Sequence, residues 1–180
     1  MTLTDTDIRE TCEEIETQWE YHLMTRAIFY STFPDKNEFR SPSFYRKNGM
    51  DFRVKLPETK IPSFDRASKG IGVWLNQNYV IRLFGILDSK QLIKYGLDNE
   101  IKIIKLIKLM RNNIGVHSTG RHANRLNELR TATELINELF GRQIDIEKVA
   151  SFTLSVDSVL YPMKCQTVTL IKGFGEKNIA

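Results

Sequence analysis

Three residues with clear chemical potential stand close together in the stretch LMRNNIGVHSTGRH, residues 109–122: Arg111, Asn112 and His117. A guanidinium can grip two phosphate oxygens and stabilise negative charge that develops on them. An imidazole can accept or donate a proton near neutral pH. The stretch therefore predicts a site that binds an anion and transfers protons.

Arg111 closes a segment, residues 100–113, whose apolar residues predict a helix. On a helical wheel with Ile101 at zero, most apolar side chains cover about 140° to 300°, and Lys102, Lys105 and Lys108 group outside this arc. Arg111 falls inside it, at about 280°. Since burying an unpaired guanidinium costs several kcal/mol, Arg111 needs a carboxylate, an anion or a water-filled cleft. The arc is also wider than a surface helix requires, and a second subunit is the simplest occupant.

Gly115 decides whether Arg111 and His117 can meet. In an unbroken helix, residues six apart differ by about 120° around the axis and lie roughly 9 Å apart along it. Glycine is the natural place for the helix to end or deform. With a break there the two side chains can converge, Asn112 belonging to the site and Asn113 only to the turn.

The elements that must position these residues are mainly helices. Three-four apolar spacing predicts helices near residues 4–30, 65–87, 100–113 and 122–140, with a Thr4–Asp7 capping box and Gly141 as a C-terminal cap. Four prolines punctuate residues 34–63, which predicts a long irregular loop. Alternation at residues 152–156 and β-branched residues at 165–171 predict two strands. We expect one domain, 1–180: a four-helix bundle about 5–141, a loop insertion about 34–63 and a C-terminal β-hairpin about 151–172.

The composition permits a polyanionic partner without requiring one, since the net charge is +4 and the pI is near 9.0. Cys12 and Cys165 lie too far apart to suggest a zinc site or a disulfide scaffold. The polar N-terminus lacks the pattern of a secretory signal, and the longest apolar segment is too short to span a bilayer. We expect a cytoplasmic protein that does not enter membranes.

The order helix, loop, helix, apolar helix, motif, helix over about residues 5–141 resembles the HEPN superfamily. Active members carry Arg, four to six residues and then His, often with a polar residue directly after the Arg. Here Arg111, Asn112 and His117 match, with five residues between Arg and His. The resemblance implies a dimeric endoribonuclease that uses neither a metal nor a cofactor and in which the motifs of two subunits approach each other.

The implied catalytic residues are Arg111 and His117, with Asn112 orienting Arg111 or the substrate. The imidazole of His117 takes a proton from the ribose 2′-hydroxyl or gives one to the leaving 5′-oxygen. DNA lacks this hydroxyl and is therefore not cleaved. Arg121, His122, Arg46 and Lys47 are further candidates for RNA contact. Many such enzymes are toxins or anti-phage effectors, which makes an antitoxin or regulatory protein a possible partner. A toxin subgroup has Tyr two residues after the His; this chain has Thr119, which leaves silencing by nucleotide attachment in doubt.

Other interpretations stay open. Arg111 can be a helix C-terminal cation paired with a carboxylate, and Asn112 and His117 can belong to a helix-ending turn. Arg121 and His122 can lie in the exposed first turn of the next helix, and the aromatic residues near Arg46 and Lys47 can pin the loop to the bundle. The chain is then a catalytically inactive HEPN-like dimeric module that binds RNA, nucleotide or a protein partner, or a structural dimerisation bundle.

Overall fold

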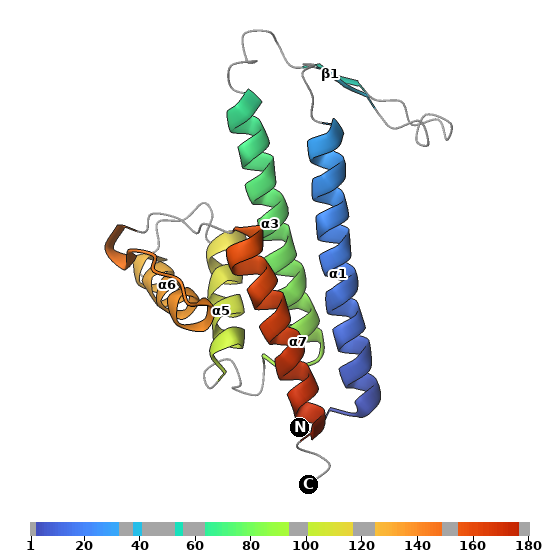
Figure 1. Ribbon diagram of the computed structural model, residues 1–180, viewed down its shortest axis with the longest axis vertical. Coiled ribbons are helices and arrows are strands. Elements are labelled where there is room, and N and C mark those ends of the chain that lie inside the picture. Colours follow the sequence, from blue (N-terminus) through green and yellow to red (C-terminus); the bar gives the residue numbers. More distant parts are fainter. Residues whose placement is uncertain are drawn as a thin grey trace. The chain divides into compact units, whose positions relative to one another are not determined.

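The computed structural model describes residues 3–32, 38–40, 53–55, 64–93, 101–116, 125–148 and 155–176, and it is mainly helical (Figure 1). The helices are α1 Asp5–Thr32, α3 Phe64–Ser89, α5 Lys102–Arg111, α6 Arg125–Phe140 and α7 Tyr161–Glu176. Shorter turns are the π-helical η2 Asn112–Val116 and η4 Val156–Leu160 and the 3-10 turn η3 Ile146–Lys148. Each of the four expected helices is present, close to its expected bounds. No helix of the described ranges has the length and apolarity that a membrane span needs.

The chain divides into two compact units, one formed by Met1–His22 with Asn76–Ala180 and the other by Leu23–Leu75. In the second unit, the guanidinium of Arg26 donates to the carbonyl of Gly72 at 3.3 Å, which joins α1 to α3. The same unit holds two strands, β1 Glu38–Arg40 and β2 Arg53–Lys55, paired antiparallel with Phe39 opposite Val54. The segment expected to be irregular throughout therefore contains a short strand pair.

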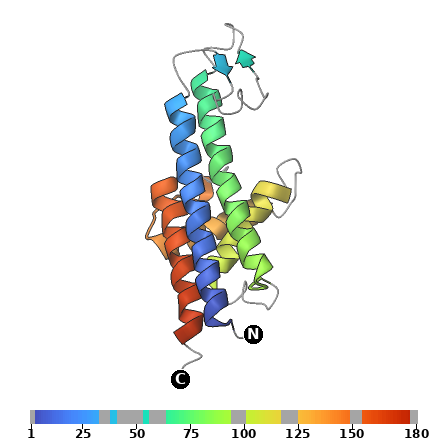
Figure 2. The same ribbon diagram turned by 90° about the vertical axis from the view of Figure 1, so that its right-hand side faces the viewer.

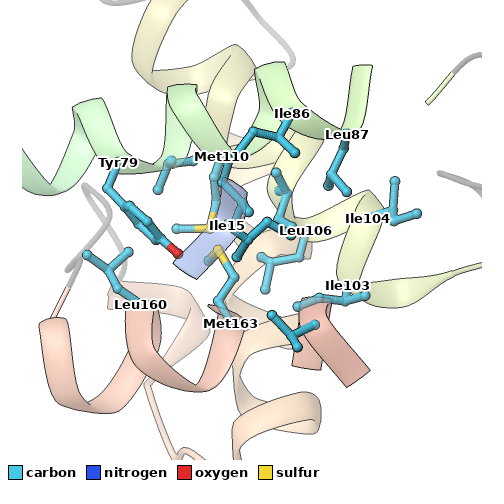
Figure 3. Close-up of a cluster of buried hydrophobic side chains, with 14 of the residues drawn as sticks. Ile15, Tyr79, Ile86, Leu87, Ile103, Ile104, Leu106, Met110, Leu160 and Met163 are labelled. Carbon is cyan, nitrogen blue, oxygen red and sulfur yellow. The ribbon is translucent and has the colours of Figure 1, made fainter. Parts of the chain in front are cut away.

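The core of the first unit is built around α5. Figure 3 shows side chains of α5 meeting Ile15 of α1, Tyr79 of α3 and Met163 of α7. In Figure 1, α6 lies beside α5 on the side away from α1. The five residues of the predicted apolar arc are all buried: Ile103, Ile104, Leu106, Ile107 and Met110. Because the chain covers this arc itself, its width is no longer an argument for a second subunit.

Local signals explain two helix ends. Thr4 and Asp7 form the predicted capping box: each backbone N–H donates to the other's side chain at 3.1 Å. The hydroxyl of Thr4 also donates to the Asp7 carboxylate at 2.6 Å, and this bond, together with the one from the Thr4 N–H, holds the pKa of the Asp7 carboxyl below its ordinary value. At the end of α6, Gly141 has a φ of +64°, a left-handed conformation that glycine adopts without strain. Both caps were predicted from the residue types alone.

The predicted C-terminal β-hairpin is wrong. Residues 151–154 lie outside the described ranges, but Val156–Leu160 form η4 and Tyr161–Glu176 form the helix α7, which runs beside α1 (Figure 1, Figure 2). The β-branched residues favour a strand locally, yet a buried stripe recurs every three or four residues: Leu160, Met163, Lys164, Thr167, Val168 and Ile171. Packing of this stripe against the core overrides local propensity.

Polar groups of α7 also fit a helix. The hydroxyl of Thr167 donates to the carbonyl of Met163 one turn earlier, at 2.8 Å. Lys164 forms an ion pair with Glu16 of α1 at 2.7 Å. Pro162 lies in the first turn of α7, where proline is tolerated.

Tyr79 gives a stability prediction. Its hydroxyl is buried without a hydrogen-bond partner among the described residues, and burial, aided by the Glu16 carboxylate, raises the pKa of Tyr79 far above its usual value. The folded protein keeps this proton where the unfolded chain loses it, so stability is full below about pH 10 and falls as the pH rises further. Tyr79→Phe should leave stability at neutral pH unchanged or raise it by up to about 1 kcal/mol, and should reduce the alkaline loss.

Urea unfolding at neutral pH and at about pH 10.5 measures both effects. Tyr161→Phe is the matched control, because Tyr161 is half-exposed and also contacts the ring of Trp19. This control should retain the full alkaline loss. A clear loss of stability at neutral pH in Tyr79→Phe would show that the hydroxyl contributes a favourable hydrogen bond.

Candidate functional site

Arg111 is the last residue of α5, and its guanidinium lies over an aromatic ring. The Cζ atom is 4.9 Å from the centroid of the Phe84 ring on α3. A guanidinium at this distance is attracted by the negative face of the ring. The helical-wheel position explains the contact, since Arg111 lies on the apolar arc and so points toward a neighbouring helix rather than along the lysine row. The side chain is half-buried.

Asn112, the next residue in the chain, also contacts the guanidinium of Arg111. Its Oδ1 accepts a hydrogen bond from Nη1 of Arg111 at 3.1 Å. The bond uses one of the five N–H donors of the guanidinium. Phe84 and Asn112 together therefore restrain Arg111 and leave most of its donors unused within the part of the chain that the structure describes.

No carboxylate partner of Arg111 is found among the described residues, so they do not support the alternative of a helix C-terminal cation paired with a carboxylate. Other cations of the first unit do have one: Lys102 pairs with Glu138, Arg130 with Glu147 at 2.7 Å, and Lys90 with Asp7 at 3.7 Å. Arg111 instead combines a ring contact with a neutral amide, and neither neutralises its charge. Such a half-buried cation suits the binding of an anion such as a phosphate.

The helix deforms earlier than the sequence suggested. Gly115 was expected to end or distort it, but the wider π-helical turn η2 begins at Asn112, directly after Arg111. π turns are rare and are often found at functional sites, and the described residues hold two of them: η2 follows Arg111, and η4 precedes α7. The η2 turn also changes the angular spacing after Arg111, so the regular wheel no longer describes the positions that follow. Gly115 lies inside the turn and not at its start.

All five of the other candidate residues fall outside the described ranges. His117, Arg121 and His122 belong to residues 117–124, and Arg46 and Lys47 belong to residues 41–52. Of the predicted site, the structure therefore brings together Arg111 and Asn112. The predicted distance between Arg111 and His117 stays a prediction.

Asn113 has a larger role than the sequence suggested. It was assigned only to the turn, yet its residue surface is 5% exposed. Its Nδ2 donates both to the carbonyl of Leu109 and to Oε2 of Glu128 on α6, each at 2.9 Å. A regular wheel places Asn113 at about 120°, just outside the apolar arc and between Lys102 and Leu106, so helical periodicity gave no clear signal of its burial.

An open hollow of about 410 Å³ lies elsewhere in the first unit, between α1 and α3. Glu14 and Gln18 line it from α1, and Ile81 and Arg82 line it from α3. Neither Arg111 nor Asn112 contributes to it. We therefore assign the candidate chemistry to the end of α5 and not to this hollow.

The ring contact of Arg111 can be tested without any ligand. Phe84→Leu keeps an apolar side chain but removes the aromatic face, which contributes about 0.5–2 kcal/mol to a cation contact. We expect the Nε–H group of Arg111 to become more mobile, as a lower heteronuclear NOE in ¹⁵N NMR. Arg142 is the internal control, because its Nε donates to the carbonyl of Ser158 at 3.2 Å. An unchanged NOE at Arg111 would mean that Asn112 alone restrains the guanidinium.

Comparison with known proteins adds no relative to this picture: no family model, no curated protein and no solved structure matches the chain.

Proposed function

We propose that the protein is a metal-independent endoribonuclease of HEPN type. The observation that carries the proposal is the state of Arg111: its guanidinium is restrained by Phe84 and Asn112 and has no carboxylate partner among the described residues. A cation that is fixed in place and not neutralised suits a phosphate whose charge grows during a reaction. The adjacent π turn and the motif His117 support the same interpretation.

The reaction requires two roles. The ribose 2′-oxygen attacks the neighbouring phosphorus while the bond to the 5′-oxygen breaks, which leaves a 2′,3′-cyclic phosphate and a 5′-hydroxyl. His117 takes the proton from the 2′-hydroxyl or gives one to the departing 5′-oxygen, and solvent water carries out the other proton transfer. Arg111 holds the phosphate oxygens and stabilises their negative charge, and Asn112 orients the guanidinium.

The helical elements are compatible with a HEPN-type four-helix bundle, because an apolar helix ends in the motif and another helix follows it. We propose that two copies form a dimer and that their motifs approach each other. Since the arc of α5 is covered within the chain, the second copy uses another surface. RNA is the substrate, with Arg121, His122, Arg46 and Lys47 as further contacts, and a toxin or anti-phage role in the cytoplasm fits such an activity, with an antitoxin as a regulatory partner.

The decisive experiment is RNA cleavage in the presence of a chelator. Purified protein should cut single-stranded RNA, leave 2′,3′-cyclic phosphate ends and spare DNA of the same sequence, because DNA lacks the 2′-hydroxyl. We expect His117→Ala to lower the rate by about 100-fold or more and Arg111→Ala by about 100- to 1,000-fold. Arg111→Lys should restore little, since an ammonium does not reproduce the planar fork.

Arg142→Ala is the matched control, because Arg142 is an exposed arginine of the same unit that bonds a backbone carbonyl. It should cleave as the native protein does. Equal cleavage by His117→Ala would point to a contaminant or another site. Binding of RNA or nucleotide without cleavage across varied sequences and pH would favour the inactive binding module. Light scattering tests the dimer, and a clean monomer would remove the shared-site mechanism.

A further inference from the structure

Asn113 joins the end of the α5 segment to the start of α6. One amide nitrogen serves two acceptors, the carbonyl of Leu109 in α5 and the carboxylate of Glu128 in α6, at 2.9 Å each. An amide NH₂ group has two hydrogens, so both bonds can form at once. We call this pair of hydrogen bonds the Asn113 latch.

The Asn113 latch carries a free-energy penalty, which argues that it has a role beyond packing. Asn113 is buried, and its Oδ1 has no hydrogen-bond partner among the described residues. Burying an amide oxygen without a partner is unfavourable, and an apolar residue would avoid the penalty. The bond to the ionised Glu128 is the stronger of the two, because charge-assisted hydrogen bonds exceed neutral ones. Glu128 in turn lies in the first turn of α6, where a helix favours a negative charge.

The latch joins residues that lie on either side of His117 in the sequence. Asn113 lies within η2, two residues after Arg111, and Glu128 lies fifteen residues further along the chain. The segment between them contains His117, Arg121 and His122. Fixing Asn113 to Glu128 therefore fixes η2, which directly follows Arg111, to the first turn of α6.

The geometry points to Asn113 as a positioning residue of the site, acting through Glu128. This inference rests on the proposed ribonuclease: the latch fixes the π turn η2 to the start of α6, so that Asn112, which lies in the same turn, holds the guanidinium of Arg111 in place. Asn113 itself touches neither the reacting phosphate nor the ribose. Loss of the latch should therefore slow the chemical step and leave RNA affinity nearly unchanged, since a small misplacement of catalytic groups costs about 100-fold in rate.

Asn113→Asp is the primary variant. It keeps the side-chain size, but the carboxylate cannot donate to Leu109 and faces the carboxylate of Glu128. We expect kcat to fall by about 10- to 100-fold near neutral pH and the Kd for uncleavable 2′-deoxy RNA to stay the same. Relative to the native protein, the defect should shrink at lower pH, when one of the two carboxyl groups takes up a proton and can donate again.

If Asn113→Asp folds poorly, a second pair of variants tests the latch at Glu128, which is half-buried in α6. Glu128→Gln keeps an acceptor oxygen for Asn113 and should retain most of kcat, whereas Glu128→Ala removes the acceptor and should lose as much as Asn113→Asp. Adding Glu128→Gln to Asn113→Asp restores a donor opposite the new carboxylate and should recover part of the rate.

Thr133→Val is the matched control for stability. Thr133 is buried in α6 and donates to the carbonyl of Leu129 at 2.8 Å, away from η2. It should lower the Tm and leave kcat unchanged. Amide hydrogen exchange over Asn112–Val116 gives a readout independent of activity: exchange should rise in Asn113→Asp and Glu128→Ala and not in Thr133→Val.

These readouts separate the possible failures. Native kcat and native exchange in Asn113→Asp would overturn the inference, as would an equal loss of kcat in Thr133→Val at matched Tm. If the native protein cleaves no RNA, the proposed function fails and the positioning role fails with it, while hydrogen exchange still decides whether the latch holds the turn.

Discussion

The first unit depends on the burial of α5, a ten-residue helix that other helices enclose on several sides. Ile103, Ile104, Leu106, Ile107 and Met110 are each at most 5% exposed and contact side chains of α1, α3 and α7 in one continuous core. Burying a side chain of this size contributes about 1.5–3 kcal/mol, whereas the net stability of a domain is only about 5–15 kcal/mol. A short helix cannot persist alone in water, so α5 exists because its neighbours cover it.

That constraint explains the surroundings of Arg111. The buried arc of α5 cannot hold an uncompensated charge, and Arg111, unlike the three lysines, lies on that arc as the half-buried last residue of the helix. Its charge is accommodated by the ring of Phe84 and the amide of Asn112. The chain then widens into a π turn whose buried amide, Asn113, bonds to α6. The candidate site is therefore continuous with the core: Phe84, which packs against the core, also contacts the guanidinium of Arg111.

Sequence patterns predicted part of the fold and of the site. The four helices and the caps at Thr4 and Gly141 follow from short-range rules, because apolar spacing and capping residues act within a few positions. Arg111 could be separated from the lysine row for the same reason. The predicted strands at residues 152–156 and 165–171 failed for α7, since β-branched residues such as Val168 and Ile171 are buried as a helical stripe by contacts with distant segments. The bond between Asn113 and Glu128 also joins separate elements, which periodicity does not pair.

The sequence by itself determined the existence of four helices, the caps at Thr4 and Gly141, the wide apolar arc of α5 and the place of Arg111 on that arc, because these properties depend on residue type and spacing alone. Only the tertiary structure decided that the arc is covered by the same chain, that the C-terminal segment is helical, that Arg111 lies on Phe84 without a carboxylate partner among the described residues, and that Asn113 is buried against α6. Each of these depends on which distant surface faces a given side chain, and desolvation and packing at that surface outweigh local preference.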